Sequence, residues 1–132
     1  MKESNFKFSN PIIEELNYTL NSNFDINKKP SVYNNFKVNI FRNESSNEAI
    51  VKLKILINDE IHNESNSPFV LAMTIGSRFT WSDVYDESTI NNLLSVNAPA
   101  LLLGYARPII ATITSNSLSH PYNIPFYNFI NE

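Results

Sequence analysis

The sequence of 132 residues contains no cysteine, only two glycines and few charged side chains. The absence of cysteine fits a reducing compartment, because disulfides form in oxidising ones. Charged residues make up 17% of the chain, and the net charge of −3 argues against nucleic acid or an anionic membrane as an electrostatic partner. The start of the chain is polar and charged, without the apolar stretch of a signal peptide. We therefore expect one cytoplasmic domain.

Patterns of catalytic or metal-binding residues are also missing. His62 and His120 lie in separate polar stretches, with no second ligand at a suitable spacing, so we expect no metal site. Asp83, Asp86 and Glu87 cluster in sequence, and we interpret them as carboxylates favoured at a helix N-terminus. No phosphate-binding loop, nucleophile elbow or paired-carboxylate motif is present. We expect neither an enzyme nor a need for a cofactor.

The most informative stretch runs from 97 to 114, NAPALLLGYARPIIATIT. Apolar residues recur at helical spacing and fill the other faces as well, so such a helix must be covered on every side. We reject a membrane span, because the run is shorter than roughly 20 residues and carries Arg107 near its middle. We expect the sheet of the same chain to cover one face and a second subunit, or else a client, to cover the other.

Four residues are expected to shape this helix. With Asn97 as the N-cap, Pro99 would occupy the first turn, where its missing N–H costs nothing. Pro108 opposes the carbonyl of Gly104, so we expect a bend between these two residues. Arg107 is expected to lay its stem along apolar surface and to direct its guanidinium to carbonyls or to a partner's carboxylate. A catalytic arginine would need a nucleophile or base nearby, and the sequence around it offers none.

Four segments before the helix alternate apolar and polar residues as strands do, at 16–20, 32–40, 50–57 and 69–79. A long polar stretch at 22–31 is expected to cross between strands, and Gly76 is a candidate β-bulge. Parallel strands would need crossover helices that the sequence does not supply, so the sheet should be antiparallel. The predicted fold is α+β: a four-stranded antiparallel sheet, then a short helix at 86–95 and the long apolar helix packed on one face.

The chain changes character again from Leu118 onward. The stretch LSHPYNIPFYNFINE contains two prolines and four aromatic residues, so a regular helix cannot run through its middle. We expect an extended aromatic arm laid across the core edge, with a binding segment as the alternative. Within a single domain, 1–132, this places strands at 1–81, helices at 82–116 and the arm at 117–132.

Several of these segments carry a family pattern in the same order. The matching residues are Asn10-Pro11, Pro68-Phe69, Phe79, Trp81, Asn97-Ala98-Pro99-Ala100, Leu103, Tyr105-Ala106-Arg107, Ile109-Ile110, Ile124-Pro125 and Asn128-Phe129. On these residues the sequence resembles the SecB family of bacterial export chaperones and its SecB-like relatives. The resemblance implies dimers that join as a tetramer through the long helix. It also implies an ATP-independent holdase that binds unfolded polypeptides in apolar grooves.

The sequence departs from the family pattern at two places. Gly104 stands where the typical helix has a proline before the tyrosine, which moves the expected bend by about one turn. The sequence also stops soon after Asn128-Phe129, where typical members continue into a second helix and an acidic tail that contacts SecA. We expect a short form without SecA docking through that tail. A chaperone or adaptor dedicated to one client, for example an antitoxin, is therefore an alternative. A small-ligand module would need a closed pocket with convergent polar groups, and the sequence shows none, so we rank it last.

Two groups of residues are candidates for binding. Client contact is predicted for the aromatic residues Phe24, Phe79, Trp81, Tyr122, Phe126 and Tyr127, with completion of the core as the alternative interpretation. Contact between subunits is predicted for Leu101, Leu102, Tyr105 and Ile109, unless the sheet covers them all. The expected partners are unfolded polypeptides and further copies of the chain, as a dimer or a tetramer, without nucleic acid or membrane insertion.

Overall fold

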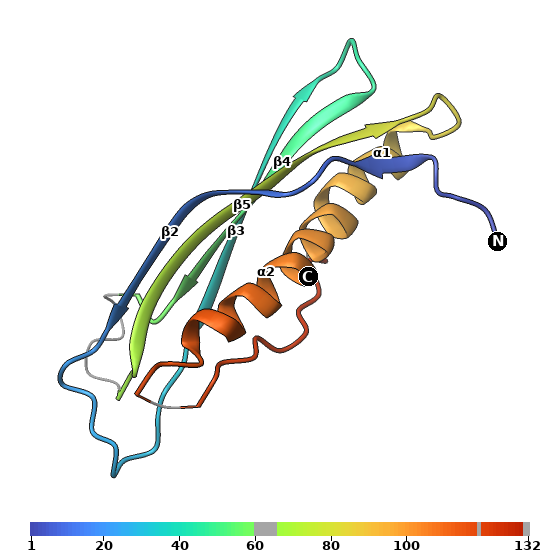
Figure 1. Ribbon diagram of the computed structural model, residues 1–132. Coiled ribbons are helices and arrows are strands. Elements are labelled where there is room, and N and C mark those ends of the chain that lie inside the picture. The colour runs from blue at the N-terminus through green and yellow to red at the C-terminus, as the bar shows by residue number, and fades with distance from the viewer. Residues whose placement is uncertain (60–65, 119, 131–132) are drawn as a thin grey trace.

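A computed structural model describes residues 1–59, 66–118 and 120–130. Five strands form one antiparallel sheet, and a long helix lies across one of its faces (Figure 1). The strands are β1 (Phe6–Phe8), β2 (Ile12–Leu20), β3 (Asn34–Asn43), β4 (Glu48–Ile57) and β5 (Phe69–Trp81). The helical segments are α1 (Glu87–Asn92), η2 (Leu93–Asn97) and α2 (Ala98–Thr114). The predicted α+β class is confirmed.

The sheet has five strands where the sequence predicted four. Its order is β1-β5-β4-β3, and β2 pairs with the same edge of β5 as β1 does. The extra strand, β1, has three residues, too few for a period of two to be recognised. Between β1 and β2 the chain stays attached to β5, since the N–H of Ser9 donates to the carbonyl of Arg78 at 2.9 Å. The segment 21–33 then crosses from this edge of the sheet to β3 at the other.

The structure has a β-bulge in β2 and not at Gly76 of β5, where the sequence predicted one. Gly76 pairs regularly with Lys52 on β4, and the irregularity lies in β2 between Ile13 and Glu15. Gly76 is needed for close approach, because an added Cβ would lie 3.1 Å from Cγ of Lys52 and 3.3 Å from the carbonyl oxygen of Val51. This residue therefore leaves room on the sheet for the neighbouring lysine stem.

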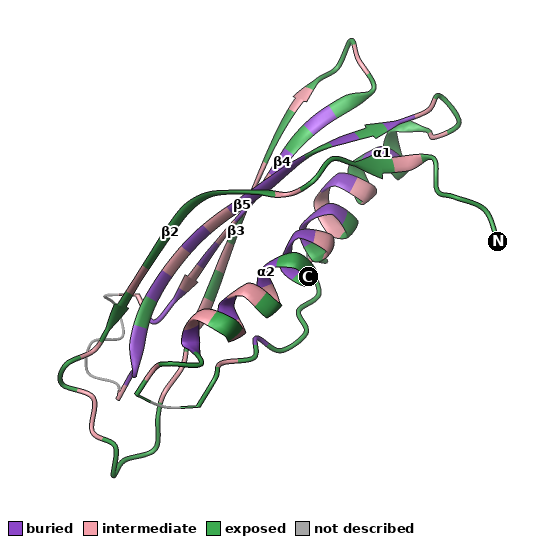
Figure 2. Cartoon of the chain, viewed as in Figure 1, coloured by how far each residue is buried: buried purple, intermediate pink, exposed green. Residues whose placement is uncertain are grey.

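The core lies between the sheet and α2 (Figure 2). The odd-numbered residues of β4 and β5 point to the helix and are buried, while the even-numbered residues point the other way. From the helix, Ala98, Leu102, Ala106 and Ile110 are fully buried at a spacing of four residues, which places them on one face. α2 packs on β4 and β5, the two central strands.

The predicted short and long helices form one continuous helix, Glu87–Thr114, of 28 residues. Asp86 is its N-cap, accepting the N–H of Thr89 at 2.8 Å. Asn97, predicted to cap the long helix, instead has helical backbone angles and makes no capping bond. A π-helical turn at Leu93–Asn97 precedes Pro99. We attribute this turn to Pro99, because its ring opposes the carbonyl of Ser95 and an inserted residue relieves that clash.

The argument from length against a membrane span was therefore wrong. The continuous helix is long and apolar enough to cross a membrane, with a mean hydropathy of 1.3 in its most apolar window. Core helices of globular proteins can have the same length and hydropathy. The fully buried side chains that α2 places on the sheet, such as Leu102 and Ala106, give it the arrangement of a core helix.

Candidate functional site

The two flanks of α2 differ in what lies beside them. Because α2 packs on β4 and β5, the outer strands β3 and β2 extend beyond it on either side. After α2 the chain turns back, and residues 120–130 run beside the helix without helix or strand structure (Figure 1). We call residues 120–130 the C-terminal arm. It fills the flank between α2 and β3.

The arm is held to α2 by one buried side chain and by contacts of Arg107. Ile124 is fully buried, and its carbonyl accepts a hydrogen bond from Nε of Arg107 at 2.8 Å. The guanidinium carbon of Arg107 also lies 4.4 Å from the ring centre of Phe126. Nearer the end of the helix, the N–H of Tyr122 donates to Oγ1 of Thr114 at 2.8 Å. Of the two contacts expected for Arg107, the structure has the one to a carbonyl of its own chain.

Aromatic side chains join the arm to β3. The ring of Phe36 lies 4.7 Å from that of Tyr127 and 5.9 Å from that of Phe129, both edge to face. The amide of Asn34 donates to the hydroxyl of Tyr127 at 2.9 Å and also to that of Tyr122. Burial raises the pKa of Tyr122 above its usual value. The flank on the β3 side is thus closed by the chain itself.

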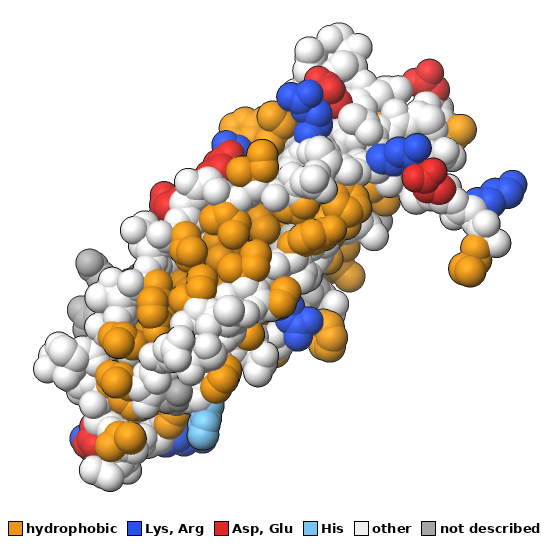
Figure 3. Space-filling view, in the orientation of Figure 1, with side chains coloured by type: hydrophobic (Ala, Val, Ile, Leu, Met, Phe, Trp, Pro, Cys, Tyr) orange, Lys and Arg blue, Asp and Glu red, His pale blue; other side chains and the backbone are white. Residues whose placement is uncertain are grey.

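The flank on the β2 side is open. Register places Ile13, Leu16 and Leu20 of β2 on the helix-facing side, opposite buried residues of β5, yet they remain 37%, 42% and 42% exposed. We call the apolar surface here the β2–α2 band. It consists of the exposed residues Phe8, Ile13, Leu16, Leu20 and Tyr105 and the half-buried residues Leu101 and Ile109. Hydrophobic side chains gather along this face in the space-filling view (Figure 3).

The helix contributes one row of residues to the band. Leu101, Tyr105 and Ile109 are four residues apart and lie on the flank of α2 opposite Arg107. Tyr105 is 45% exposed, and its ring meets that of Phe8 edge to face at 5.9 Å, closing one end of the band. Contiguous apolar surface of this kind is typical of interaction sites.

The outer edge of β2 adds backbone groups to this surface. Within the described ranges, β2 pairs with β5 alone. The edge of β2 that faces away from β5 therefore presents N–H and C=O groups that none of the described strands pairs. An extended polypeptide can hydrogen-bond to such an edge as an added strand.

Two residues predicted to contact clients lie in the core. Phe79 is 1% exposed and Trp81 is 6% exposed. The ring of Phe6 stacks on both, at 5.3 and 6.3 Å, and the guanidinium of Arg42 covers Trp81 at 5.3 Å. Their position agrees with the alternative interpretation, in which these aromatic residues complete the core. Neither is accessible at the surface.

The other four predicted client residues lie outside the β2–α2 band. Phe24 is half-buried in the segment that crosses to β3. Tyr122 is half-buried, while Phe126 and Tyr127 are exposed, and all three belong to the arm. The structure does not bring these four residues together into one surface with the helix row.

Three of the four residues predicted to contact a second subunit belong to the band. The fourth, Leu102, is fully buried against the sheet of its own chain. Sequence reasoning missed the contribution of Ile13, Leu16 and Leu20. Their alternation predicted a strand with one apolar face, but no signal in the sequence indicated that the helix would leave that face uncovered.

The carboxylates considered for chemistry serve structural contacts. Asp86 caps the helix, and this hydrogen bond lowers its pKa. Glu87 accepts two hydrogen bonds from Arg42, both at 2.9 Å, which lower its pKa, and Asp83 accepts one from Asn47 at 2.6 Å. No group of three or more metal-ligating side chains occurs among the residues that the structure describes. His62 lies outside the described residues.

An α+β domain with an open apolar band beside an unpaired strand edge belongs to the class of proteins that bind other polypeptides. Comparison of the sequence with protein families narrows this class. The chain belongs to the SecB family, described as preprotein translocase subunit SecB, whose family model matches residues 13–131. Membership of this family supports a chaperone function, as the sequence predicted.

Individual relatives are distant in sequence. An uncharacterized protein of Methanocaldococcus jannaschii is 25% identical over 124 residues, covering 92% of this chain and 78% of that protein. A SecB-like chaperone of Mycobacterium tuberculosis, solved in complex with a peptide from the HigA1 antitoxin, matches with a TM-score of 0.74 at 8% identity, covering 93% of this chain and 91% of the other. A protein of unknown function from Streptococcus agalactiae has a TM-score of 0.57 at 15% identity, covering 95% and 100%. These two structures share the fold.

Proposed function

We propose that the chain is an ATP-independent holdase that binds extended apolar segments of unfolded polypeptides along β2. The observation that carries the proposal is the open β2–α2 band beside the unpaired edge of β2. Burial of apolar surface is non-directional, so Ile13, Leu16 and Leu20 accept side chains of many shapes. Hydrogen bonds to the strand edge add affinity that does not depend on the client's sequence. Such binding needs neither nucleotide nor a cofactor.

Homo-oligomerisation is the second part of the proposal. The helix row is apolar, with Tyr105 45% exposed and Leu101 and Ile109 half-buried, so it needs a cover when no client is bound. We propose that the same row of a second copy supplies it, because a symmetric dimer brings identical patches together. Two such dimers would form the tetramer that the family resemblance implies. The strand part of the band then remains for the client.

A holdase dedicated to one client is the second candidate function. It is favoured by the M. tuberculosis relative, which was solved with a peptide from an antitoxin. The family description, a preprotein translocase subunit, favours instead a client range set by protein export. SecA would be a partner in that case, although the acidic tail through which typical members contact it is not part of this sequence. Both versions use the same surface and are expected in the cytoplasm. They differ in how many unrelated polypeptides are bound.

Suppression of aggregation tests the proposal. A chemically unfolded, slowly refolding protein is diluted into buffer without nucleotide, with the chain present in near-stoichiometric amount, while light scattering records the mass of the chain alone. Leu16→Glu should raise the Kd for unfolded protein about tenfold or more, because it removes the burial of a leucine from the contact. Its oligomer mass should not change. Tyr105→Glu should lower the mass by placing charge in the helix row.

Ile26→Glu is the matched control. Ile26 is 77% exposed in the crossing segment, away from the band, and should change neither property. The dedicated holdase would be supported if the chain binds one polypeptide tightly but does not suppress the aggregation of several unrelated proteins. Normal suppression by Leu16→Glu would show that β2 is not the client surface.

A further inference from the structure

The face of the sheet opposite the helix carries an unusual set of charges. Side chains on this outer face follow from the strand register, because the residues that alternate with the core residues must point away from α2. The cations there are Lys7, Lys37, Lys52, Lys54 and Arg78, half of the ten in the chain. The acidic residues are Glu14, Glu15 and Glu48. A chain with a net charge of −3 thus has a face of net positive charge.

Three of these cations have no acidic partner among the described residues. Lys7 pairs with Glu3 at 3.7 Å and Lys52 with Glu14 at 3.0 Å, whereas no ion pair of Lys37, Lys54 or Arg78 occurs within 1–59, 66–118 and 120–130. Lys37 and Lys54 are directly opposite one another on β3 and β4. Like charges in this position repel, so the pair lowers the stability of the free chain. An anion bound between them would remove that cost.

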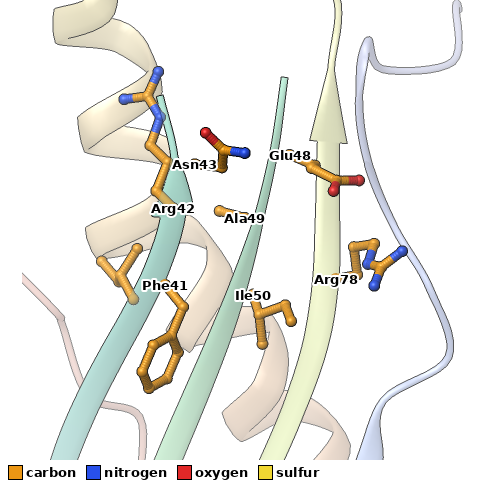
Figure 4. A pocket seen from close by; sticks show the side chains of 8 residues that line it. Phe41, Arg42, Asn43, Glu48, Ala49, Ile50 and Arg78 are labelled. Carbon is orange, nitrogen blue, oxygen red and sulfur yellow. The ribbon is translucent and has the colours of Figure 1, made fainter. Parts of the chain in front are cut away.

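Exposed apolar groups lie beside the free cations. Phe41, Ile50 and Arg78 occupy one row across β3, β4 and β5, and Figure 4 shows them on neighbouring strands with the helix behind the sheet. Phe41 is 56% exposed and Ile50 is 36% exposed. This row lines a hollow of about 530 Å³, and a second hollow of about 310 Å³ lies on the other side of Ile50. Both hollows include Arg78.

The floor of the second hollow is set by Gly76. Ile12, 66% exposed, pairs with Gly76 from one side, and Lys52 pairs with it from the other. Because Gly76 has no side chain, the stem of Lys52 lies close to the sheet, with its ammonium drawn to Glu14 and placed 5.5 Å from the ring of Phe41. The row between Arg78 and the lysine pair is therefore apolar at its β5–β2 end, where Gly76 and Ile12 lie.

We propose that the outer face is a second binding surface, distinct from the β2–α2 band, and that it takes an extended acidic segment of a partner protein. One carboxylate of the segment lies at Arg78, an apolar side chain sits over Gly76 and Ile12, and a second carboxylate lies between Lys37 and Lys54. These three rows are two residues apart along β5, at positions 78, 76 and 74. Side chains two residues apart in an extended segment share a face, so the segment has the pattern acidic, any, apolar, any, acidic.

The charges select this occupant over two others. A second copy of the chain would bring the same cations against this face, and the repulsion would oppose pairing. A purely apolar segment would leave Arg78 and the lysine pair desolvated without partners, which is costly. An acidic segment of about five residues spans the distance of about 13 Å between the outer rows, at roughly 3.3 Å per residue.

A labelled peptide tests the proposal. It is blocked at both ends and carries two glutamates four residues apart with a leucine midway between, and its binding to the full chain is followed by fluorescence anisotropy. The double variant Lys37→Glu/Lys54→Glu should weaken binding about tenfold or more, since each exposed ion pair contributes a factor of up to about five and reversal also adds repulsion. Glu48→Gln should strengthen binding, because Glu48 lies one row from Arg78 and competes with the incoming carboxylate.

Lys28→Glu/Lys29→Glu is the matched control, with the same change of net charge in the exposed crossing segment. It should leave binding within about twofold, and Leu16→Glu in the β2–α2 band should do the same. Fluorescence of Trp81, the single tryptophan, checks that each variant is folded. Equal weakening by both lysine pairs, equal binding of a peptide with lysines in place of the glutamates, or equally tight binding of short single-stranded DNA would overturn the proposal.

Discussion

The two flanks of α2 differ in what covers their apolar side chains. On the β3 side, the arm places Ile124 in the core and lies under the guanidinium of Arg107. On the β2 side, the row containing Tyr105 stays exposed beside Leu16. Both flanks combine an apolar helix row with a strand at the edge of the sheet. One of them is covered by the chain's own polypeptide, and the other is available to a different polypeptide.

The covered flank also shows how an extended segment is held on this fold. Within residues 120–130 the arm forms no strand with β3. It is held by one buried side chain, one carbonyl bound to Arg107, one N–H bound to Thr114, hydrogen bonds from Asn34, and aromatic packing. Apolar burial therefore provides most of the attachment, with few backbone bonds. Because the arm is tethered, its effective concentration is high, whereas a separate client on the open flank must bind at its own concentration.

The largest expected effect is a difference in how much each flank contributes to the free energy of unfolding. Ile124→Ala should lower the free energy of unfolding by about 2–4 kcal/mol, since it removes a fully buried side chain and leaves a cavity. Leu16→Ala, on the open flank and 42% exposed, should lower it by less than about 1 kcal/mol. Urea unfolding followed by Trp81 fluorescence, at one protein concentration, measures both. Equal losses would mean that the two flanks are equally covered in solution.

A smaller effect is expected from the contact between helix and arm. Arg107→Met keeps an apolar stem but removes the bond to the Ile124 carbonyl and the stacking on Phe126, so stability should fall by about 1–2 kcal/mol. Chymotrypsin should then cleave the arm after Phe126 or Tyr127 faster than in the parent chain. Arg78→Met, on the outer face, is the control and should leave that cleavage unchanged. Unchanged cleavage in Arg107→Met would show that the arm is held without this residue.

The sequence predicted one flank of α2 better than the other. The all-round apolar pattern of 97–114 indicated a helix that its own sheet covers only in part, and helical geometry accounts for the exposure of Tyr105 and the partial burial of Leu101 and Ile109. Which strand would lie beside that row depends on sheet order. The pairing of β1 and β2 with β5 joins residues between 49 (Leu20 and Phe69) and 75 (Phe6 and Trp81) positions apart, and alternation within each strand contains no information about its partner.

The errors in the helix and the aromatic residues have local causes. Asn97 and Pro99 are residues typical of a helix start, yet the helix already runs through Leu93 and Leu94 before them. The π-helical turn accommodates the proline ring within the continuous helix. Phe79 and Trp81 end a strand whose other odd-numbered residues are buried, so the period of two already placed them in the core. The charges of the outer face were visible in the sequence, but their grouping requires the register of four strands.

The smallest expected effect compares two tyrosines, Tyr122 on the covered flank and Tyr18 on the open one. Burial raises the pKa of both above the ordinary value of 10.0. A hydroxyl with a raised pKa in the folded chain contributes stability that is fully present below about pH 10 and is lost as the pH rises through the folded value. Stability should therefore decline on the alkaline side, and the variants Tyr122→Phe and Tyr18→Phe should each make the decline less steep. Urea midpoints measured from about pH 8 to about pH 11 report it.

A client peptide distinguishes the two tyrosines. Tyr18 points to the helix side of β2 between Leu16 and Leu20, so an unfolded polypeptide bound on the open flank would bury it further and raise its pKa more. The benefit of Tyr18→Phe above about pH 10 should thus grow as the concentration of an extended apolar peptide is raised. That of Tyr122→Phe should stay constant, because Tyr122 is part of the arm and already packs against Asn34 and Phe69 within one chain. A dependence on peptide concentration shared by both variants would show that the peptide also binds the flank that the arm covers.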